Sequence, residues 1–261
     1  RHQKVVEEAQ SPSISSDLRR QLLEAGVKAA ESVNYKSAGT IEFIVSENND
    51  FYFLEMNTRL QVEHPVTEMI TGIDLVKEQI RVAMGHPLSF TQDDLHINGH
   101  AMEVRVYAED PSNNFLPDIG KLVTYQPPKG PGVRVDDGFE QGMDIPIYYD
   151  PMIAKLVTHG ATREEAIARM IRAIDDYKIT GVTTTLPFCK FVLQHEAFTS
   201  GKFDTHFVKH YFTPDKLNQS DADEEVIAAL IAAQFMSQKR QSVASDSQPV
   251  GRSRWKQNRL G

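Results

Sequence analysis

The stretch from Phe51 to Pro65, FYFLEMNTRLQVEHP, constrains the fold most, because polar and apolar residues alternate along it. Successive side chains of a strand point to opposite faces, so this pattern predicts a strand with one apolar and one polar face. A straight polar face would span about 26 Å, too far for one small ligand, and His64-Pro65 predicts a bend near Gln61–Pro65. The alternative is an ordinary solvated strand face. The polar face carries carboxylates, amides and one guanidinium: Glu55, Glu63, Asn57, Gln61 and Arg59.

A second alternating run, Thr40–Val45, comes before this stretch, and the turn-forming residues Ser46–Asp50 between them predict a β-hairpin. With a four-residue loop, Glu42 would lie directly opposite Glu55. Opposed residues have Cβ atoms about 4.5–5.5 Å apart, and two carboxylates there repel unless a cation neutralises them. Oxygen ligands without His or Cys favour Mg²⁺ or Mn²⁺, and Asn57 adds an amide oxygen on the same face. The hairpin therefore predicts a metal–phosphate site.

Composition narrows the class of protein. The chain has 261 residues, 40% hydrophobic and 25% charged, which is typical of a soluble globular protein of one to two domains. The net charge of −8 argues against general nucleic-acid binding. The sequence lacks an apolar run of about 18 residues that could span a membrane. Without a signal peptide, and with Cys189 as the single cysteine and an expected buried thiol, a cytoplasmic location is favoured.

Apolar spacing predicts the helices of the first part of the chain. Ser16–Val33 is expected to be a helix with Ser16 as its N-cap. A second helix is expected at about Gly72–Met84, ended by the glycine and proline that follow. Its apolar stripe is predicted to be core: Ile73, Val76, Ile80 and Ala83.

A second unit is predicted beyond a boundary near Leu95–Gly99. It opens with a predicted strand, His100–Glu109, which has Arg105 among its polar positions. Thr162 and Glu165 are predicted to form a capping box. The other predicted elements are the strands Val133–Val135 and Ile153–Thr158 and the helices Glu164–Tyr177, Leu186–Gln194 and Asp223–Lys239.

Three segments, in this order along the chain, resemble the biotin carboxylases, the ATP-grasp components of biotin-dependent carboxylases. They are RHQK at Arg1–Lys4, EMNTRLQVEHPVTEMITG at Glu55–Gly72 and EVRVYAEDP at Glu103–Pro111. The resemblance implies an α+β fold, which begins with the C-terminal half of an ATP-grasp domain, with an antiparallel sheet and helices. The biotin carboxylase C-terminal α/β domain would follow.

The resemblance also implies the domain boundaries. Residues 1–98 would belong to the ATP-grasp domain, residues 99–213 to the C-terminal domain, and residues 214–261 to a helix and a flexible basic tail. Because RHQKVVEEA is typical of the inside of a folded unit and Arg1 is no initiator Met, we expect a segment of a longer protein. The lid that covers ATP would then lie before Arg1, and the segment alone would be inactive.

For the site residues, the resemblance implies roles in two half-reactions. Bicarbonate would be bound by Lys4, Arg59, Gln61 and the backbone of Val62. Glu63 would be the general base that deprotonates bicarbonate, and ATP would then give carboxyphosphate. Arg105 would stabilise the enolate-like oxygen of biotin, although alone in an alternating strand it would more often be a surface residue. For Arg59 and Glu63 the alternative is a simple i, i+4 ion pair.

Nucleotide contacts are also implied by the resemblance. His2 and Ile44 would contact ATP, with Glu42 and Glu55 through the metal, and His206 aligns loosely near the same site. Ile44 could equally be a core residue, and His206 an ordinary surface or core histidine.

The predicted function is an ATP-dependent ligase that carboxylates biotin on its carrier protein, with acetyl-CoA carboxylase as the preferred assignment and fatty acid biosynthesis as its context. The expected partners are a biotin carboxyl carrier protein, a carboxyltransferase and a second copy bound through the C-terminal domain. Propionyl-CoA, methylcrotonyl-CoA and pyruvate carboxylases are alternatives within the family. Outside it, the alternatives are another ATP-grasp ligase, which would form a carbamoyl phosphate or use an amino acid, and a non-catalytic dimer-forming module.

Overall fold

The computed structural model describes residues 4–146, 148–217, 226–227, 229–234 and 236. The chain divides into two compact units, Arg1–Leu217 and Asn218–Gly261. In the second unit the described residues are helical, in agreement with the helix predicted there, whereas the predicted tail lies outside the described residues. No helix in the described part of the chain is long and apolar enough to cross a membrane.

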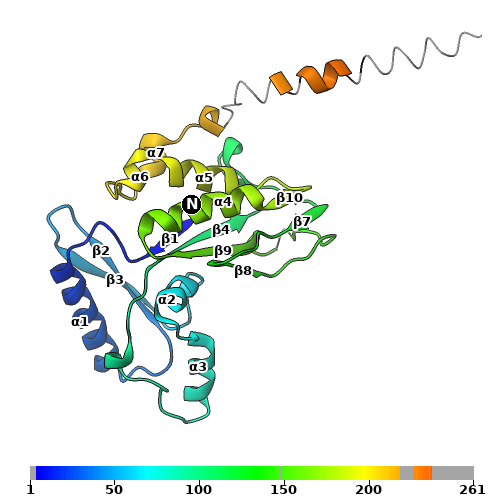
Figure 1. Ribbon diagram of the computed structural model, residues 1–261. Coiled ribbons are helices and arrows are strands. Elements are labelled where there is room, and N and C mark those ends of the chain that lie inside the picture. The colour runs from blue at the N-terminus through cyan, green and yellow to red at the C-terminus, as the bar shows by residue number, and fades with distance from the viewer. Residues whose placement is uncertain (1–3, 147, 218–225, 228, 235, 237–261) are drawn as a thin grey trace, which may run out of the picture. The chain divides into compact units, whose positions relative to one another are not determined.

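The first part of unit 1 consists of helices α1, α2 and α3 and the hairpin of strands β2 and β3 (Figure 1). The side chain of Ser15, not Ser16, accepts a hydrogen bond from the Leu18 amide and caps α1, so the predicted N-cap is wrong by one residue. The elements are α1 Ser16–Ser32, β2 Thr40–Val45, β3 Phe51–Asn57, α2 His64–Thr71 and α3 Leu75–Ala83.

In the hairpin, Glu42 lies opposite Glu55, as predicted, but by a different route. Val45 pairs with Phe51, so the loop has five residues and not four. The register then shifts between Glu42 and Phe43, where a β-bulge adds one residue to β3. The longer loop shifts the strand register by one residue and the bulge shifts it back, so the two carboxylates lie on the same face.

The predicted strand from Phe51 to Pro65 is too long. Strand β3 ends at Asn57, a turn follows, and helix α2 begins at His64 with Pro65 in its first turn. Proline is tolerated there, because the first helical amides have no intrahelical acceptor. The sequence prediction missed this helix and placed the bend too late.

Helix α3 also differs from the prediction. Its expected core stripe is largely exposed, with Val76 at 44% and Ile80 at 57%, whereas Glu78 is buried. The Glu78 carboxylate accepts hydrogen bonds from the amide and the hydroxyl of Ser89, which compensate for its loss of water. Helix α3 therefore turns a polar residue inward at this point.

A four-stranded antiparallel sheet dominates the second part of unit 1, with strand order β1-β4-β9-β8. Its strands are β1 Val6–Ala9, β4 His100–Tyr107, β9 Met152–Gly160 and β8 Val133–Asp137. Residues from the start of the chain thus add an edge strand to the later sheet, a pairing that the sequence did not predict. Two short two-stranded sheets accompany it. In one, β10 Lys178–Thr180 pairs with β7 Thr124–Gln126, and in the other, β5 Glu109–Asp110 pairs with β6 Leu116–Pro117.

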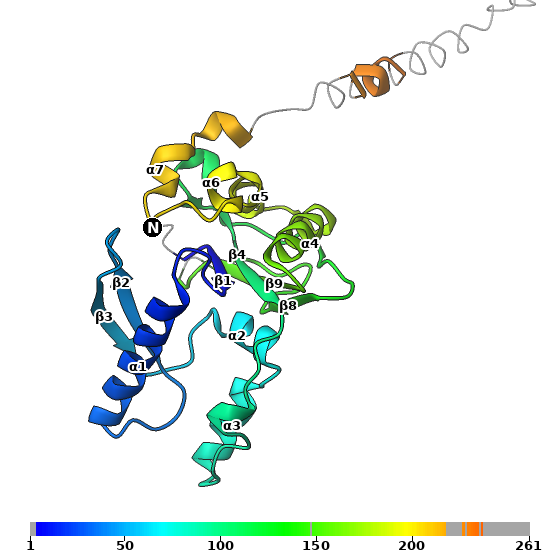
Figure 2. The ribbon, with the colours of Figure 1, turned by 60° about the vertical axis from the view of Figure 1, so that its left-hand side comes forward.

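Helices cover both faces of this sheet, with α4 and α5 on one side and α2 on the other (Figure 2). The main core lies beneath α4 and α5, where Met102, Val104 and Val106 are fully buried, as is the predicted thiol Cys189. Thr162 caps α4 as predicted, but the Glu165 carboxylate accepts from the amide of Ala161, outside the cap. The remaining helices are α4 Arg163–Asp176, α5 Leu186–Gln194, α6 Glu196–Thr199, α7 Phe207–Tyr211 and the 3₁₀ turns Gln92–Asp94, Pro111–Asn113 and Pro214–Leu217.

Candidate active site

Two carboxylates and an amide meet on the polar face of the hairpin. The Asn57 side chain donates to Glu42 Oε1 at 3.1 Å and to Glu55 Oε1 at 3.0 Å. The Lys4 ammonium lies 2.5 Å from the same Glu42 oxygen. One ammonium group and one amide group thus contact carboxylates that would otherwise repel one another.

These residues form a donor set of hard oxygen atoms, which fits Mg²⁺ or Mn²⁺ when phosphate oxygens complete the coordination. The Asn57 oxygen, and not its nitrogen, would be the ligand, so metal binding and the two amide hydrogen bonds exclude one another. Among the described residues no group of three or more His, Cys, Asp or Glu side chains could hold a metal. Mg²⁺ typically uses one or two protein carboxylates together with phosphate oxygens, and the hairpin offers two carboxylates.

Glu63 lies at the centre of a second set of contacts. Its two oxygens are 3.3 Å from Lys4 Nζ and 2.9 Å from Arg105 Nη2. Arg105 Nε is 3.0 Å from Glu7, and Arg105 Nη1 donates a long hydrogen bond of 3.4 Å to the Tyr107 hydroxyl. A continuous series of ion pairs therefore runs from the hairpin to strands β1 and β4.

Arg59 does not form the i, i+4 ion pair with Glu63 that the sequence left as an alternative. Its side chain is exposed and donates to the Leu60 carbonyl at 3.3 Å. Gln61, in contrast, is buried between Asn57 and Glu63. With its amide nitrogen turned toward Glu63, it would donate to both carboxylate oxygens at 3.1 and 3.2 Å and accept from Asn57 at 3.0 Å.

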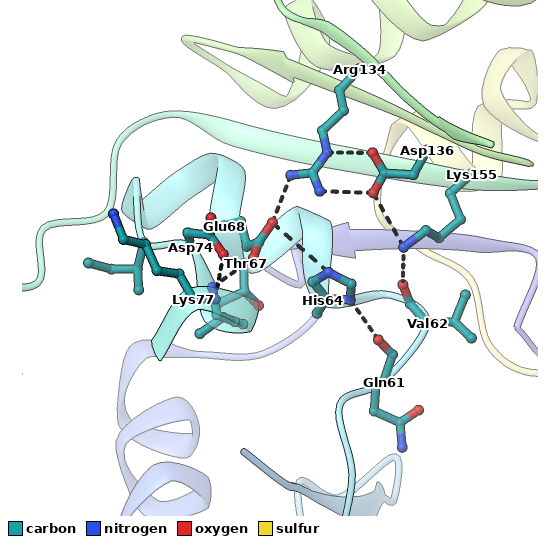
Figure 3. Close-up of polar contacts among 12 residues, drawn as sticks. Gln61, Val62, His64, Thr67, Glu68, Asp74, Lys77, Arg134, Asp136 and Lys155 are labelled. Atoms are coloured by element: carbon teal, nitrogen blue, oxygen red, sulfur yellow. Dashed lines mark hydrogen bonds and ion pairs between the residues drawn. The ribbon is translucent and has the colours of Figure 1, made fainter. Parts of the chain in front are cut away.

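Three cations from neighbouring strands contact helix α2 and the segment that leads into it. Lys155 of β9 donates to the Val62 carbonyl at 3.2 Å, and Arg134 of β8 pairs with Glu68 of α2 at 2.7 Å (Figure 3). Arg105 of β4 supplies the third contact, to Glu63. Asp136 joins the other two cations, since it pairs with Arg134 at 2.7 Å and with Lys155 at 3.4 Å.

The sequence prediction missed Lys155, Arg134 and Glu7. One signal was available for Lys155, which stands among the apolar residues of the first part of strand β9, MIAKLV. A single interruption of this kind normally indicates a residue with a specific buried partner, because an unpaired charge is costly to bury.

Burial changes the proton affinity of two glutamates beneath this site. Desolvation raises the pKa of Glu7 to about 7, against the opposing effect of Arg105. For Glu103, desolvation and the neighbouring Glu7 charge raise the pKa to about 8. Desolvation works against the charge of Arg105, but Glu7 and its other partners leave the pKa of Arg105 raised.

Of the residues predicted to contact the nucleotide, Glu42 and Glu55 lie in the hairpin cluster described above. Ile44 lies on the hairpin and is 55% exposed, so it is not a core residue in this structure. His206 lies at the start of α7 and lines a cavity of about 390 Å³ together with Val5, Phe198 and Phe203. His2 lies outside the described residues.

Two family models match the chain. Residues 1–91 match the carbamoyl-phosphate synthase L chain ATP-binding domain, and residues 103–210 match the biotin carboxylase C-terminal domain. The first model ends and the second begins on either side of the predicted boundary near Leu95–Gly99.

Curated relatives extend this similarity. A pyruvate carboxylase subunit of Methanothermobacter thermautotrophicus is 56% identical over 211 residues, which are 81% of this chain and 43% of that protein. Biotin carboxylase 1 of Bacillus subtilis is 54% identical and covers 81% of this chain and 47% of its own length. The mitochondrial propionyl-CoA carboxylase alpha chain of Sus scrofa is 49% identical, over 96% of this chain and 36% of its own length. The chain thus spans less than half the length of these relatives.

Among solved structures, the dimeric biotin carboxylase domain of Hydrogenobacter thermophilus 2-oxoglutarate carboxylase, in complex with MgADP, ADP and bicarbonate, superposes with a TM-score of 0.80. Its sequence is 43% identical, and the match covers 84% of this chain and 48% of that one.

Proposed function

This chain belongs to the biotin carboxylase family, and we propose that it supplies the metal-binding and bicarbonate-binding side of an active site that carboxylates biotin with ATP and bicarbonate. The observation that supports this most directly is the series of ion pairs from Glu42 through Lys4 and Glu63 to Arg105. These residues come from four separate parts of the sequence. A reaction with a short-lived activated intermediate needs such proximity, because the intermediate must meet biotin before it meets water.

In the proposed first half-reaction, Lys4 and Arg59 hold bicarbonate, together with Gln61 and the backbone of Val62. Arg59 suits this role because its exposed guanidinium, whose only described contact is a long hydrogen bond to a carbonyl, can bind an anion with two parallel N–H donors. Glu63 accepts the bicarbonate proton, and a bicarbonate oxygen attacks the γ-phosphorus of ATP to give carboxyphosphate and ADP. A Mg²⁺ or Mn²⁺ held by Glu42, Glu55 and Asn57 would neutralise charge on the phosphates.

In the proposed second half-reaction, carboxyphosphate breaks down to CO₂ and phosphate, the phosphate takes the N–H proton of biotin's ureido group, and the ureido nitrogen attacks CO₂. Arg105 stabilises the ureido oxygen as it becomes enolate-like. In the structure this guanidinium is paired with Glu63 at 2.9 Å. When Glu63 has taken the bicarbonate proton, its carboxyl group is neutral and holds Arg105 less strongly. The proton transfer that starts the first half-reaction thus frees the cation that the second one requires.

We propose the final carboxyl acceptor and the protein partners only as those of the biotin carboxylase family in general. The names of the relatives include pyruvate and propionyl-CoA carboxylases, so the acetyl-CoA carboxylase assignment is one of several that the family allows. A biotin carrier protein and a carboxyltransferase would complete the reaction. A dimer through residues 99–213 is proposed by analogy with the dimer named for the 2-oxoglutarate carboxylase domain.

The proposal is tested by assaying the enzyme that contains this chain with bicarbonate, Mg-ATP and free biotin. We expect ATP cleavage that depends on bicarbonate and carboxybiotin formation that depends on both. ATP cleavage that requires an amino acid or ammonia instead, without carboxybiotin, would favour another ATP-grasp ligase and overturn the proposal.

The metal assignment makes a separate prediction. In the same enzyme, Glu55→Gln should raise the Mg²⁺ concentration for half-maximal activity by at least about tenfold, because a charged ligand is replaced by a neutral one. The exposed loop residue Glu47 provides the matched control, Glu47→Gln, which should leave metal dependence unchanged. Equal Mg²⁺ titrations for the two variants would show that Glu55 is not a ligand.

The chain by itself should bind Mg-ATP weakly and should not turn it over. The hairpin that carries the metal residues is open, with Tyr52 at 62% and Leu54 at 51% exposure. Ligand pockets usually bury about 70–90% of their ligand, which an open face of this kind cannot do. Calorimetry with Mg-ATP and an ATPase assay with bicarbonate and biotin would measure this, and turnover by the isolated chain would contradict it.

A further inference from the structure

Strands β1 and β4 bring two glutamates face to face beneath Arg105. Glu7 and Glu103 are direct cross-strand partners in the antiparallel register. Glu103 is fully buried, and the side chain of Glu7 is only 13% exposed. Directly opposed residues have Cβ atoms about 4.5–5.5 Å apart, so two charges here would repel strongly away from water.

The surroundings of the pair do not supply enough donors for two ionised carboxylates. None of the four carboxylate oxygens has a hydrogen-bond partner among the described residues. The cation that pairs with Glu7 is Arg105, whose Nε is 3.0 Å from the Glu7 carboxylate. Lys155 of β9 lies opposite Arg105 and diagonal to Glu103, and it is already engaged by Asp136 and by the Val62 carbonyl.

The other charged groups near the pair do not supply the missing donors for two ionised carboxylates. Glu63 adds a third negative charge from the turn before α2, and Lys4, from the segment before β1, is paired with Glu42 and Glu63. Buried carboxylates that lack donors are normally made neutral by protonation. One proton between the two glutamates would leave a single charge to face Arg105.

We propose that Glu7 and Glu103 share one proton in the neutral pH range and that the resulting monoanionic pair positions Arg105 for its role with biotin. The positioning role rests on the proposed function. Charge on Glu7 holds the Nε edge of the guanidinium, and this leaves the terminal nitrogens for Glu63 and for the substrate oxygen. A second charge on Glu103 would draw Arg105 away from Glu63 toward the sheet. The raised pKa values of both glutamates agree with one shared proton.

The first test uses the chain itself and needs no substrate. Infrared spectroscopy near neutral pH should show the C=O band of a buried protonated carboxyl group, and the band should disappear as the pH rises through about 8. Glu103→Gln should abolish the band, because the new amide donates to Glu7 and removes the need for a proton. Glu7→Gln should do the same from the other strand, and this second variant decides the question if Glu103→Gln does not fold. The control is Glu24→Gln, at an exposed position of helix α1, which should keep the band.

Thermal unfolding gives a second readout on the same variants. The pKa of Glu103 is raised from 4.5 to about 8 on folding, so the folded state binds more protons between these values. Stability from this group is therefore present below pH 4.5 and is lost as the pH rises toward about 8. The wild-type chain should lose Tm relative to Glu103→Gln across that range, whereas Glu24→Gln should follow the wild type.

The positioning role is tested in the enzyme that contains this chain. Glu7→Gln should raise KM for biotin by about tenfold or more and should change KM for ATP much less, a split that a general loss of folding would not give. No carboxyl band in the wild type, or a band that survives both Gln variants, would overturn the proton-sharing pair. A normal KM for biotin in Glu7→Gln would overturn the positioning role. These failures leave the proposed function intact, because the assay of bicarbonate-dependent ATP cleavage and carboxybiotin formation tests that function separately.

Discussion

Replacement of Glu63 by Gln in the enzyme that contains this chain should lower bicarbonate-dependent ATP cleavage by about 10²–10⁴-fold, the range typical of a lost general base. Gln keeps the size of the side chain but cannot accept the bicarbonate proton. The effect should appear in ATP cleavage itself, because the proposed proton transfer comes before carboxyphosphate exists. Initial rates of ADP release with saturating bicarbonate, with and without biotin, would measure it.

Two further variants test whether the loss of ATP cleavage is specific to the loss of the base at Glu63. Glu31→Gln, at an exposed position of helix α1, should retain wild-type rates. Arg59→Ala should also depress ATP cleavage, but mainly through a higher KM for bicarbonate, since Arg59 is proposed to bind the anion and not to accept its proton. If Glu63→Gln cleaves ATP as fast as Glu31→Gln does, Glu63 is not the base.

The local part of the site could be predicted from the sequence. Alternation gave strand β2 at its observed bounds, and the opposition of Glu42 and Glu55 is confirmed. It was reached through an assumed loop that is one residue too short, and a β-bulge restores the register. Periodicity detects the faces of a strand, whereas a single inserted residue leaves no periodic signal.

The contacts that assemble the site could not be predicted in the same way. Glu7 joins β4 through a pairing between strands that are far apart in the sequence, and alternation within either strand contains no information about that partner. Arg105 was expected, from its strand alone, to be more often a surface residue, but it is 8% exposed because helix α2 packs against β4 and strand β1 pairs beside it. Burial of a charged side chain depends on tertiary neighbours, which a single sequence does not reveal.

Helix α2 is an intermediate case, because its signal was present but was outweighed. Val66 and Ile70 are buried four residues apart, at helical spacing, and Pro65 is typical of a helix start. The strong alternation before them favoured continuation of the strand. The helix matters for the site, because it fixes Glu63 at its N-terminal end and Glu68 on its surface, where Arg105 and Arg134 bind them.

Replacement of Arg105 by Ala should separate the two half-reactions. Carboxybiotin formation should fall by about 10²–10³-fold, equivalent to the 2.7–4 kcal/mol typical of one lost oxyanion stabiliser. Bicarbonate-dependent ATP cleavage should fall less, because Arg105 contacts Glu63 but is not proposed to bind bicarbonate or phosphate.

Arg105→Lys should recover little carboxybiotin formation, since an ammonium group cannot bind Glu7, Glu63 and a substrate oxygen through a planar fork. The ratio of ADP released to carboxybiotin formed should therefore rise sharply in both variants and stay unchanged in the surface control Arg20→Ala. A wild-type ratio in Arg105→Ala would mean that this guanidinium, despite its place beside Glu63, holds the two parts of the fold together and takes no part in the transfer to biotin.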